Sequence, residues 1–526
     1  MITVFDLRLL FVRITMIPIR YVMCILCLFI SFTTYLTRSN IGIAIVSMAA
    51  PPKRDNYSYP NLCRDPIQDA SLDDDEESGG EVFDWSPELQ GSVLGSFSWT
   101  YFLFQLPSGY IASRFGGRLP ITFSFLITAI ITGLGPMIAH TSVYLFITSR
   151  AFMAIFQAAI YPGMFVIMMH WMPIQERPIG MAMVEAGIHI GNIVMYFTSG
   201  FLIEKFTWTS MFYFPAIGSV VTLILATILL RNKPEDHFLC SHEEVNYIRK
   251  HGIAGKADSE LTSPTSGDGE SDCVDLVDNN NDSNKMKHYP IPWKKMLTNR
   301  VVIVLLLFKF SRYICSALIT ANMPGYFRNV LNEGIIHVGI LYAVYTSIVF
   351  ITIMISAKGS EVLIARGFIT RTNCRKFASI FSGLMPSIAL MMIPVMRCNS
   401  GAVKFFFFLC ALGQGFQLIS EGMIPAEISA NFYAILFAIV NMSSIIPGFI
   451  APLITGLVLG KLGGEWLAWD IVIHSFGAIG IVTFLFFFIF ISAEKQDFDD
   501  VHDLQQRQTR SMSIVSAMSC SHRLPL

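Results

Sequence analysis

Charged side chains are scarce in this 526-residue chain. Asp, Glu, Lys and Arg make up 14% of its residues, whereas a soluble protein has about a quarter of its residues in this class. Hydrophobic residues account for 53%, which is enough for about a dozen membrane spans of about 20 residues each. The scarcity of charge excludes a soluble enzyme with a membrane tether and a single-span receptor. The composition predicts a polytopic α-helical protein embedded in a lipid bilayer.

The chain also lacks the features of several other functional classes. Lysines and arginines number 37 against 38 acidic residues, so there is no basic excess for nucleic acid. Ten cysteines in a chain of this length do not indicate a disulfide framework, and Cys24 and Cys27 lie in an apolar run without nearby polar ligands. No phosphate-cradling Walker loop, nucleophile–base pair or metal-spaced histidine cluster is present. We therefore expect neither an ATP-driven pump nor an enzyme, and no cofactor or metal.

Long apolar runs predict twelve membrane helices. They cover residues 21–50, 87–112, 119–139, 143–170, 179–203, 211–230, 299–325, 335–356, 376–396, 403–425, 432–459 and 470–492. These runs form two six-helix bundles, at 21–230 and 299–492, around a polar linker at 231–298. The linker is rich in Ser, Asp, Asn and Gly and is predicted to be mostly disordered. No cleavable signal is recognisable, so we expect the first span to be retained.

The placement of Lys and Arg in the short loops predicts the orientation. Bases cluster at 113–118 and 357–376, which lie on one side of a twelve-span arrangement together with the linker. That side is predicted to be the cytoplasm, and it would also hold the N-terminal segment 1–20 and the C-terminal tail 493–526. The acidic loop 51–88 falls on the opposite side. It contains the acceptor sequence Asn56-Tyr57-Ser58, which predicts glycosylation at Asn56.

A weak internal repeat relates the two halves. The segment Gly109–Arg118 follows the second predicted helix, and Ala357–Glu361 follows the eighth. Such duplication is typical of transporters that rock two bundles about a central site, and a channel or receptor would not need it. Arg114, Arg118 and Glu361 in these loops are predicted to take part in gating.

The first of these loops resembles a known signature. The pattern Gly109-Tyr-Ile-Ala-Ser113-Arg114-Phe-Gly-Gly-Arg118 is similar to the loop between helices two and three of the major facilitator superfamily, with Ser113 in place of the usual aspartate. Further segments resemble one branch, the anion–cation symporters (solute carrier family 17), which includes vesicular glutamate transporters, sialin, and phosphate and urate carriers. They are Arg38–Met48, Trp85–Gly91, Leu94–Trp99, Tyr161–Gly163, Trp171–Arg177 and Ile446–Pro452. The resemblance implies an all-α major facilitator fold.

Several charges fall inside predicted spans, where each costs at least ~2.5 kcal/mol unless it faces a cavity or a partner. They are Arg38, Arg150, Glu185, His189, Lys309, Arg312, Glu421 and Glu427. A guanidinium can hold a carboxylate or phosphate by two parallel hydrogen bonds, so several arginines around a central cavity would attract an anion. The alternative is that each arginine caps a helix end or pairs with a buried glutamate.

The resemblance assigns roles to some of these positions. Arg38, Arg150 and Arg312 match positions at which vesicular glutamate transporters carry functional arginines, and we predict that all three bind substrate. Two positions depart from that subset. Gln157 stands where glutamate and sialic acid carriers have a glutamate tied to proton coupling, and Leu94 replaces a histidine. The substrate therefore cannot be copied from one relative.

Other polar residues in the spans suit coupling or substrate contact. Glu185 and His189 are four residues apart on one helix face and can share a proton, although a neutral hydrogen-bonded pair is an equal alternative. Gln414 and Gln417 could donate hydrogen bonds to a substrate or join two helices. Glu427 matches an aspartate at the cytoplasmic end of helix ten, with a gating or structural role.

Together these features predict a secondary active transporter that works by alternating access. The expected substrate is a small organic or inorganic anion of the acidic amino acid, sialic acid or phosphate class, coupled to H⁺ or Na⁺. We expect a monomer in the plasma membrane or in a lysosomal or vesicular membrane. A non-transporting sensor or receptor on the same fold is the alternative, and the three intramembrane arginines argue against it.

Overall fold

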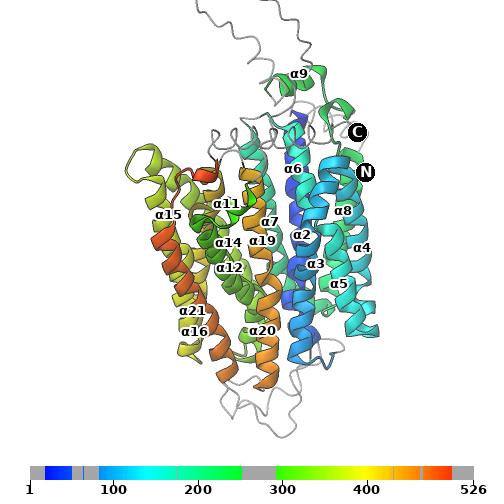
Figure 1. Cartoon of the computed structure of the whole chain (residues 1–526). Helices are drawn as coiled ribbons and strands as arrows, with labels where there is room; N and C mark the ends of the chain where they lie inside the picture. Colours follow the sequence, from blue (N-terminus) through cyan, green and yellow to red (C-terminus); the bar gives the residue numbers. More distant parts are fainter. Residues whose placement is uncertain are drawn as a thin grey trace, which may run out of the picture.

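The structure is a computed structural model, and it is built from long helices that run side by side (Figure 1). It describes residues 18–49, 63, 82–173, 176–251, 292–429, 432–462 and 466–499. The predicted glycosylation site Asn56, most of the N-terminal segment and most of the C-terminal tail lie outside these residues.

The N-terminal half contains six spans. They are α2 (Ile19–Met48), α3 (Pro87–Phe115), α4 (Arg118–Thr141), α5 (Val143–Gln157) continued by α6 (Ile160–Trp171), α7 (Arg177–Phe206) and α8 (Ser210–Leu229). Figure 1 shows these helices, coloured blue to teal, on the right of the molecule.

The C-terminal half repeats the arrangement with more interrupted helices. Its spans are α12 (Arg300–Ala317), η3 (Leu318–Asn322) and α13 (Met323–Asn329); α14 (Ile335–Ala365); α15 (Arg371–Ser379), η4 (Ile380–Leu384) and α16 (Met385–Met396); α17 (Ser400–Gln414), η5 (Leu418–Gly422) and α18 (Ile424–Ile428); α19 (Tyr433–Ile445) and α20 (Pro447–Lys461); and α21 (Trp466–Phe490). The segments η3, η4 and η5 are single π-helical turns.

The twelve predicted spans are all present as helices. Among the described residues, eleven helical segments are long and apolar enough to cross a membrane. The twelfth span is α3, which has 29 residues and is therefore also long enough. Its sequence is less apolar because one side of it packs against the other bundle rather than lipid. Its start is well defined, since the Ser86 hydroxyl accepts a hydrogen bond from the Leu89 amide and Pro87 occupies the first turn.

Two predicted loops contain more helix than expected. The predicted loop 357–376 is reduced to a short turn, because α14 continues to Ala365 and α15 begins at Arg371. Gly367 in this turn has a φ of +72°, which glycine adopts without a steric penalty. The predicted linker 231–298 contains η2 (Pro234–Asp236), α9 (His242–His251) and α11 (Trp293–Leu297). The prediction of a mostly disordered linker therefore missed its ordered beginning and end.

The ordered beginning of the linker is fixed to the N-terminal bundle. The Glu244 carboxylate accepts hydrogen bonds from the backbone amides of Ile19 and Arg20 at 2.9 and 3.0 Å, so it caps α2. The Arg20 guanidinium also contacts Glu176 at 2.8 Å, and the Tyr247 hydroxyl donates to the same carboxylate. Burial opposes the charge of Glu176, but these two hydrogen bonds outweigh it and hold the pKa of its carboxyl below the usual value.

A second segment docks in the same way on the C-terminal bundle. After α21 the chain turns into η6 (Asp497–Asp499), where Phe498 is buried in an apolar cluster with Met296 and Ile428. The fully buried Asp499 carboxylate accepts a hydrogen bond from the Ser429 hydroxyl at 2.8 Å. The beginning of the C-terminal tail is thus part of the folded bundle. We call the end of the molecule that carries α9 and η6 the linker end.

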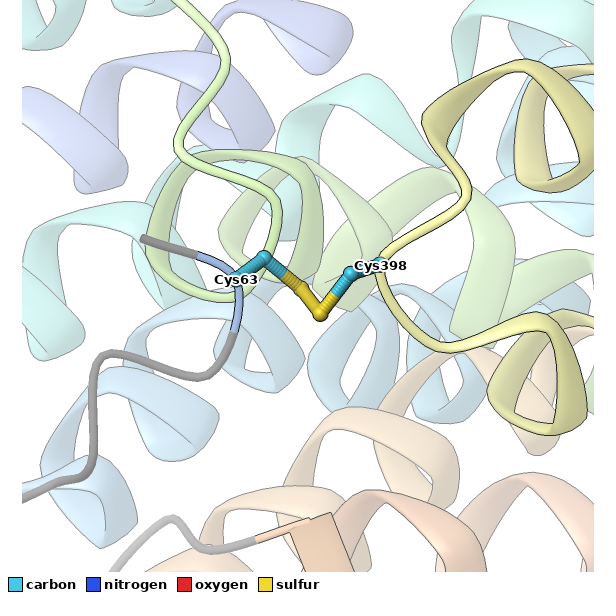
Figure 2. The surroundings of a disulfide bond; sticks show 2 residues. All are labelled: Cys63 and Cys398. Carbon is cyan, nitrogen blue, oxygen red and sulfur yellow. A yellow bond between two sulfur atoms is a disulfide. The ribbon is translucent and has the colours of Figure 1, made fainter. Parts of the chain in front are cut away.

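The opposite end carries a disulfide bond between Cys63 and Cys398 (Figure 2). Cys63 belongs to the long loop between α2 and α3, and Cys398 lies between α16 and α17. The bond therefore joins a loop of the N-terminal half to a turn of the C-terminal half. The sequence did not predict this pairing, since no local pattern connects two cysteines 335 residues apart. We call this end the disulfide end.

The two bundles contact each other closely in the half of the molecule near the disulfide end. A methyl group added at Gly91 of α3 would lie 2.5 Å from the carbonyl oxygen of Pro452 in α20, and one added at Gly339 of α14 would lie 2.7 Å from the carbonyl oxygen of Tyr196 in α7. At both places the backbones touch without intervening side chains. Gly42 of α2 packs in the same way on the carbonyl of Thr320 in η3.

Such close backbone contacts are not found at the linker-end glycines of α3 and α14. Gly109 of α3 and Gly359 of α14 have no atom within 4 Å of the position that a methyl group would take. Large apolar side chains of this part of α3 are exposed, among them Leu106, Tyr110 and Phe115. The described residues thus form a structure that is closed between the bundles at the disulfide end and open at the linker end.

We predict that cleavage of the linker will not separate the two halves. Trypsin applied to the linker face of sealed vesicles should cut near Lys256 or Lys285, and the two fragments should stay together on a non-reducing gel because Cys63–Cys398 joins them. Reduction should release them. The Cys398→Ser variant is the control and should give separate fragments without reductant. Separate fragments from the unreduced wild type would contradict the disulfide, and an uncut linker would contradict its exposure on this face.

Candidate functional site in the membrane

Arg38 lies near the middle of the membrane. It precedes the end of α2 by ten residues, a distance of about 15 Å along the helix. Its Nε donates a hydrogen bond of 2.9 Å to the Oε1 of Gln157. Four aromatic rings surround the guanidinium carbon at 4.6–5.7 Å, namely Tyr35, Phe97, Tyr101 and Tyr161. These rings stabilise the cation without neutralising it, and no described carboxylate pairs with it.

Gln157 holds Arg38 with an amide that is hydrogen-bonded through both its oxygen and its nitrogen. Its Oε1 accepts from Arg38, and its Nε2 donates to the hydroxyls of Thr37 and Thr128 at 3.2 Å each. The residue is completely buried. An amide has no titratable proton, so protonation at this position cannot release Arg38.

Arg312 is arranged differently. Its Nε and one terminal nitrogen both donate to the Oε1 of Glu421, at 3.0 and 2.5 Å, and both side chains are less than 5% exposed. At Arg312 the structure therefore has the alternative arrangement, in which the arginine pairs with a buried glutamate. The pair is electrically neutral, although Arg312 keeps one terminal nitrogen and Glu421 one oxygen without a partner in the described part of the chain.

Arg38 and Arg312 belong to one region but are not in contact. Tyr35 of α2 lies within electrostatic range of both Arg38 and Tyr313 of α12, and the Arg312 guanidinium stacks on the Tyr313 ring at 4.3 Å. Each arginine thus has a tyrosine of its own helix beside it.

Arg150 lies apart from this region. It is buried within the N-terminal bundle and borders a small cavity that α4, α5 and α8 line with residues such as Thr132, Ser149 and Phe212. Its Nε has no hydrogen-bond partner in the described residues. The structure therefore does not bring Arg150 together with Arg38 and Arg312, and it shows neither a helix cap nor an ion pair there.

Glu185 and His189 are adjacent at the boundary between the bundles. The Nε2 of His189 lies 3.7 Å from the Oε1 of Glu185, and its ring packs on Phe350 of α14 at 5.4 Å. The His189 side chain is 9% exposed and the Glu185 side chain 48%. Because lipid disfavours an exposed carboxylate, Glu185 must face water between the bundles. Both ring nitrogens of His189 lack a hydrogen bond within the described structure.

The two predicted glutamines lie where α17 meets η5. Gln414 donates a hydrogen bond of 2.6 Å to the Ser316 hydroxyl of α12, so it joins two helices of the C-terminal bundle. Gln417 is half-buried three residues later.

The residues predicted for gating lie at the linker end. Arg114 donates to the Tyr110 hydroxyl, Arg118 to the carbonyl of Thr227, and Glu361 pairs with Lys358 on the surface. Each of these contacts stays within one bundle, which is consistent with the separation of the bundles at this end.

Glu427 is also at the linker end, but it is mostly buried. The Arg375 guanidinium binds its carboxylate with two hydrogen bonds of 3.0 and 2.6 Å, and donates a third to the carbonyl of Ile419. This bidentate pair ties α15 to α18. In the sequence Arg375 counts only among the bases of 357–376, and the pairing with Glu427 was not predicted.

One cation in the predicted spans, Lys309, has no role assigned from the sequence. Lys309 of α12 is 5% exposed and donates a hydrogen bond of 3.0 Å to the Oδ1 of Asn441 in α19. With Arg150, Arg312 and Arg375 it makes four buried cations in the described spans, against one buried carboxylate, Glu421. The described interior therefore carries an excess of positive charge.

Comparisons with known proteins agree with this arrangement. The sequence profile described as Major Facilitator Superfamily matches residues 27–431. The chain is 27% identical to sialin of Ovis aries over 483 residues, which cover 91% of this chain and 90% of that protein. It is 25% identical to vesicular glutamate transporter 3 of Danio rerio, with 92% and 75% of the two chains covered. These relatives confirm the resemblance to the anion–cation symporter branch, and they are transporters, not enzymes.

Solved structures show the same fold. A bacterial homologue of the human lysosomal transporter Spinster matches with a TM-score of 0.62 at 12% identity, over 90% of this chain and 97% of that one. A D-xylose–proton symporter matches with a TM-score of 0.59 at 13% identity, over 91% and 99%. Both confirm the prediction of two six-helix bundles in the major facilitator fold. The chain belongs to the major facilitator superfamily.

Proposed function

We propose that the chain transports a small anion, with a carboxylate or phosphate group, through the space between its two bundles. The observation that carries this proposal is Arg38, a mid-membrane guanidinium held by a neutral amide and aromatic rings. A cation without a carboxylate partner at this depth attracts an anion. The excess of buried cations supports the same charge preference. So do the names of the relatives, which include sialin, vesicular glutamate transporters and a probable urate exporter of Mus musculus.

In alternating access, one end of the transporter is closed while the other end is open to substrate. The bundles meet through glycine contacts at the disulfide end and are apart at the linker end, so the described conformation admits substrate from the linker end. Closing that end would bring the loops with Arg114 and Arg118 toward the C-terminal bundle, where Glu361 and Glu427 lie. A sensor built on the same fold would have no need for an uncompensated cation in this position.

The orientation we propose places the linker end in the cytoplasm. The basic loops at this end support it through the positive-inside rule. The disulfide supports it from the other side, because such bonds form in extracellular, lumenal or vesicular compartments. The proposed locations are the plasma membrane or a lysosomal or vesicular membrane.

Coupling to a proton is best supported at Glu185 and His189. The pair lies between the bundles, and a histidine changes its charge near neutral pH. Gln157 cannot take this role, because it has no titratable proton. A Na⁺-coupled mechanism remains the second candidate for the coupling ion, as the sequence predicted.

The first test is uptake of a panel of carboxylate and phosphate anions into proteoliposomes. Replacing Arg38 should remove ~2–5 kcal/mol of substrate interaction, as for a buried charge pair, so Arg38→Ala should abolish measurable uptake. Arg38→Lys should also fail, because a point charge does not reproduce the planar fork. Arg249→Ala, at an exposed position of α9, is the control and should remain active. Normal uptake by Arg38→Ala would refute the anion site.

The second test concerns the coupling pair. Glu185→Gln should remove the dependence of uptake on a pH gradient while leaving exchange of substrate across the membrane, because exchange needs no net proton movement. The measurement is uptake with and without an imposed pH gradient, compared with counterflow in the same vesicles. An unchanged response to pH would assign Glu185 and His189 a purely structural role.

The third test introduces a titratable group beside Arg38. Gln157→Glu would place a carboxylate about 3 Å from the guanidinium, a range in which opposite charges interact strongly. The carboxylate should neutralise Arg38 at neutral pH and release it when protonated, so uptake should become strongly dependent on acid. Thr128→Val, which removes one hydrogen bond to the same amide, is the control and should show no new pH dependence. The same pH profile for Gln157→Glu and the wild type would contradict the role of Gln157.

A further inference from the structure

Lys309 has an environment that none of the preceding roles explains. Its side chain is 5% exposed within the membrane-spanning part of the C-terminal bundle. Its ammonium donates to the Asn441 amide oxygen at 3.0 Å and lies 5.8 Å from the centre of the Tyr313 ring. Among the described residues no carboxylate lies within 4.0 Å of it. A lysine ammonium has three donors, so one hydrogen bond leaves two for another partner.

The neighbouring charges do not compensate Lys309. Arg312 lies one helical turn further along α12, and it binds the buried carboxylate of Glu421 with two of its nitrogens. The Arg312–Glu421 pair is neutral as a unit. The net charge of this part of the C-terminal bundle is therefore the charge on Lys309.

The position of Lys309 can be compared with that of Arg38 along the membrane normal. Helix α2 and segment η3 touch where Gly42 meets Thr320. Arg38 precedes this contact by four residues and Lys309 by eleven, so at about 1.5 Å per residue Lys309 lies about 10 Å nearer the linker end. Tyr313 connects the two sites, since it contacts Lys309 and lies within electrostatic range of Tyr35 beside Arg38.

Burying an ammonium without a counter-charge costs several kcal/mol in a protein interior. A neutral amide such as Asn441 orients the ammonium but supplies no negative charge. An anion that arrives from the open linker end would supply it and would gain two charge-assisted hydrogen bonds. Arg312 would attract an anion less strongly than Lys309, because the charge of Arg312 is already neutralised by Glu421.

We propose that Lys309, oriented by Asn441, is the contact of the C-terminal bundle for the anionic group of the substrate. An anion that enters from the linker end meets Lys309 before it reaches Arg38 in the N-terminal bundle. Lys309, rather than Arg312, is thus the C-terminal counterpart of Arg38, and both cations are held by neutral amides. This inference rests on the proposed transport of carboxylate or phosphate anions.

The competing explanation is that Lys309 and Asn441 only join α12 to α19. A double variant separates the two explanations. Lys309→Met alone leaves the Asn441 amide without its donor, so it would lose stability under either explanation. Adding Asn441→Leu removes both polar groups, and an apolar pair of similar shape can restore the packing.

The experiment measures uptake of an anion that the wild type transports, together with the melting temperature of each purified protein. We expect Lys309→Met/Asn441→Leu to melt as the wild type does but to lose at least about tenfold in uptake at low substrate concentration, the order of effect of an unpaired ligand charge. Lys309→Arg, which keeps the positive charge, should retain part of the uptake. Asn441→Leu alone, which keeps the ammonium, should raise the KM less than Lys309→Met does.

The outcomes are distinct from those for the proposed function. Wild-type uptake by the double variant would show that Lys309 only joins two helices, and it would overturn the inference while leaving anion transport intact. A wild type that transports no carboxylate or phosphate anion would overturn the proposed function itself, whatever the variants do.

Discussion

A charged group inside a bilayer needs either a partner or water, and the spans of this protein meet that need in two ways. At Arg312 the partner is a carboxylate, so the pair carries no net charge. At Arg38 and Lys309 the partner is the oxygen of a neutral amide, Gln157 or Asn441. The first arrangement stabilises the C-terminal bundle. The second leaves positive charge in the membrane, and the substrate preference of the transporter depends on it.

The packing of the bundles provides the rigid frame for these side chains. At the linker end, the segment that follows the last helix of each half packs back onto that half. Glu244 of the linker caps the start of α2, and Asp499 of the tail accepts a hydrogen bond from Ser429. The two contacts are made by the segments that follow α8 and α21, the last span of each half. They stay within their own bundles, so they stiffen each half without joining the halves to each other. Relative motion of the bundles can therefore occur without unfolding either one.

The sequence was sufficient for the fold because the hydrophobic requirement of a membrane span is local. Each run of about 20 apolar residues specifies a helix by itself, and all twelve predicted helices are present. Helix α3 shows where this reasoning weakens, since a helix at the bundle contact needs small and polar residues rather than apolar ones. The limits of α14 and α15 were also missed, because Lys358, Glu361 and Arg371 are polar but helical.

The candidate site was only partly predictable. Arg38, Arg312, Glu185 and His189 could be found because charge in an apolar run is conspicuous. Their partners could not be found in this way, since Glu421 is 109 residues from Arg312 and Asn441 is 132 residues from Lys309. Whether a cation is neutralised depends on which helices the fold places together. The same applies to Cys63 and Cys398, whose pairing depends on the meeting of two distant loops.

The glycine contacts between the bundles have a consequence for the energetics of the transport cycle. Backbone meets backbone at Gly91 and Pro452, and again at Gly339 and Tyr196. Between these points a few aromatic rings also pack across the contact, such as Trp99 on Phe449. At the glycines no side chain has to change its rotamer for the bundles to separate. The two conformations can then be close in free energy, and a ligand shifts such an equilibrium by its difference in affinity for the two states. A single anion bound between the halves can in this way decide which side is open.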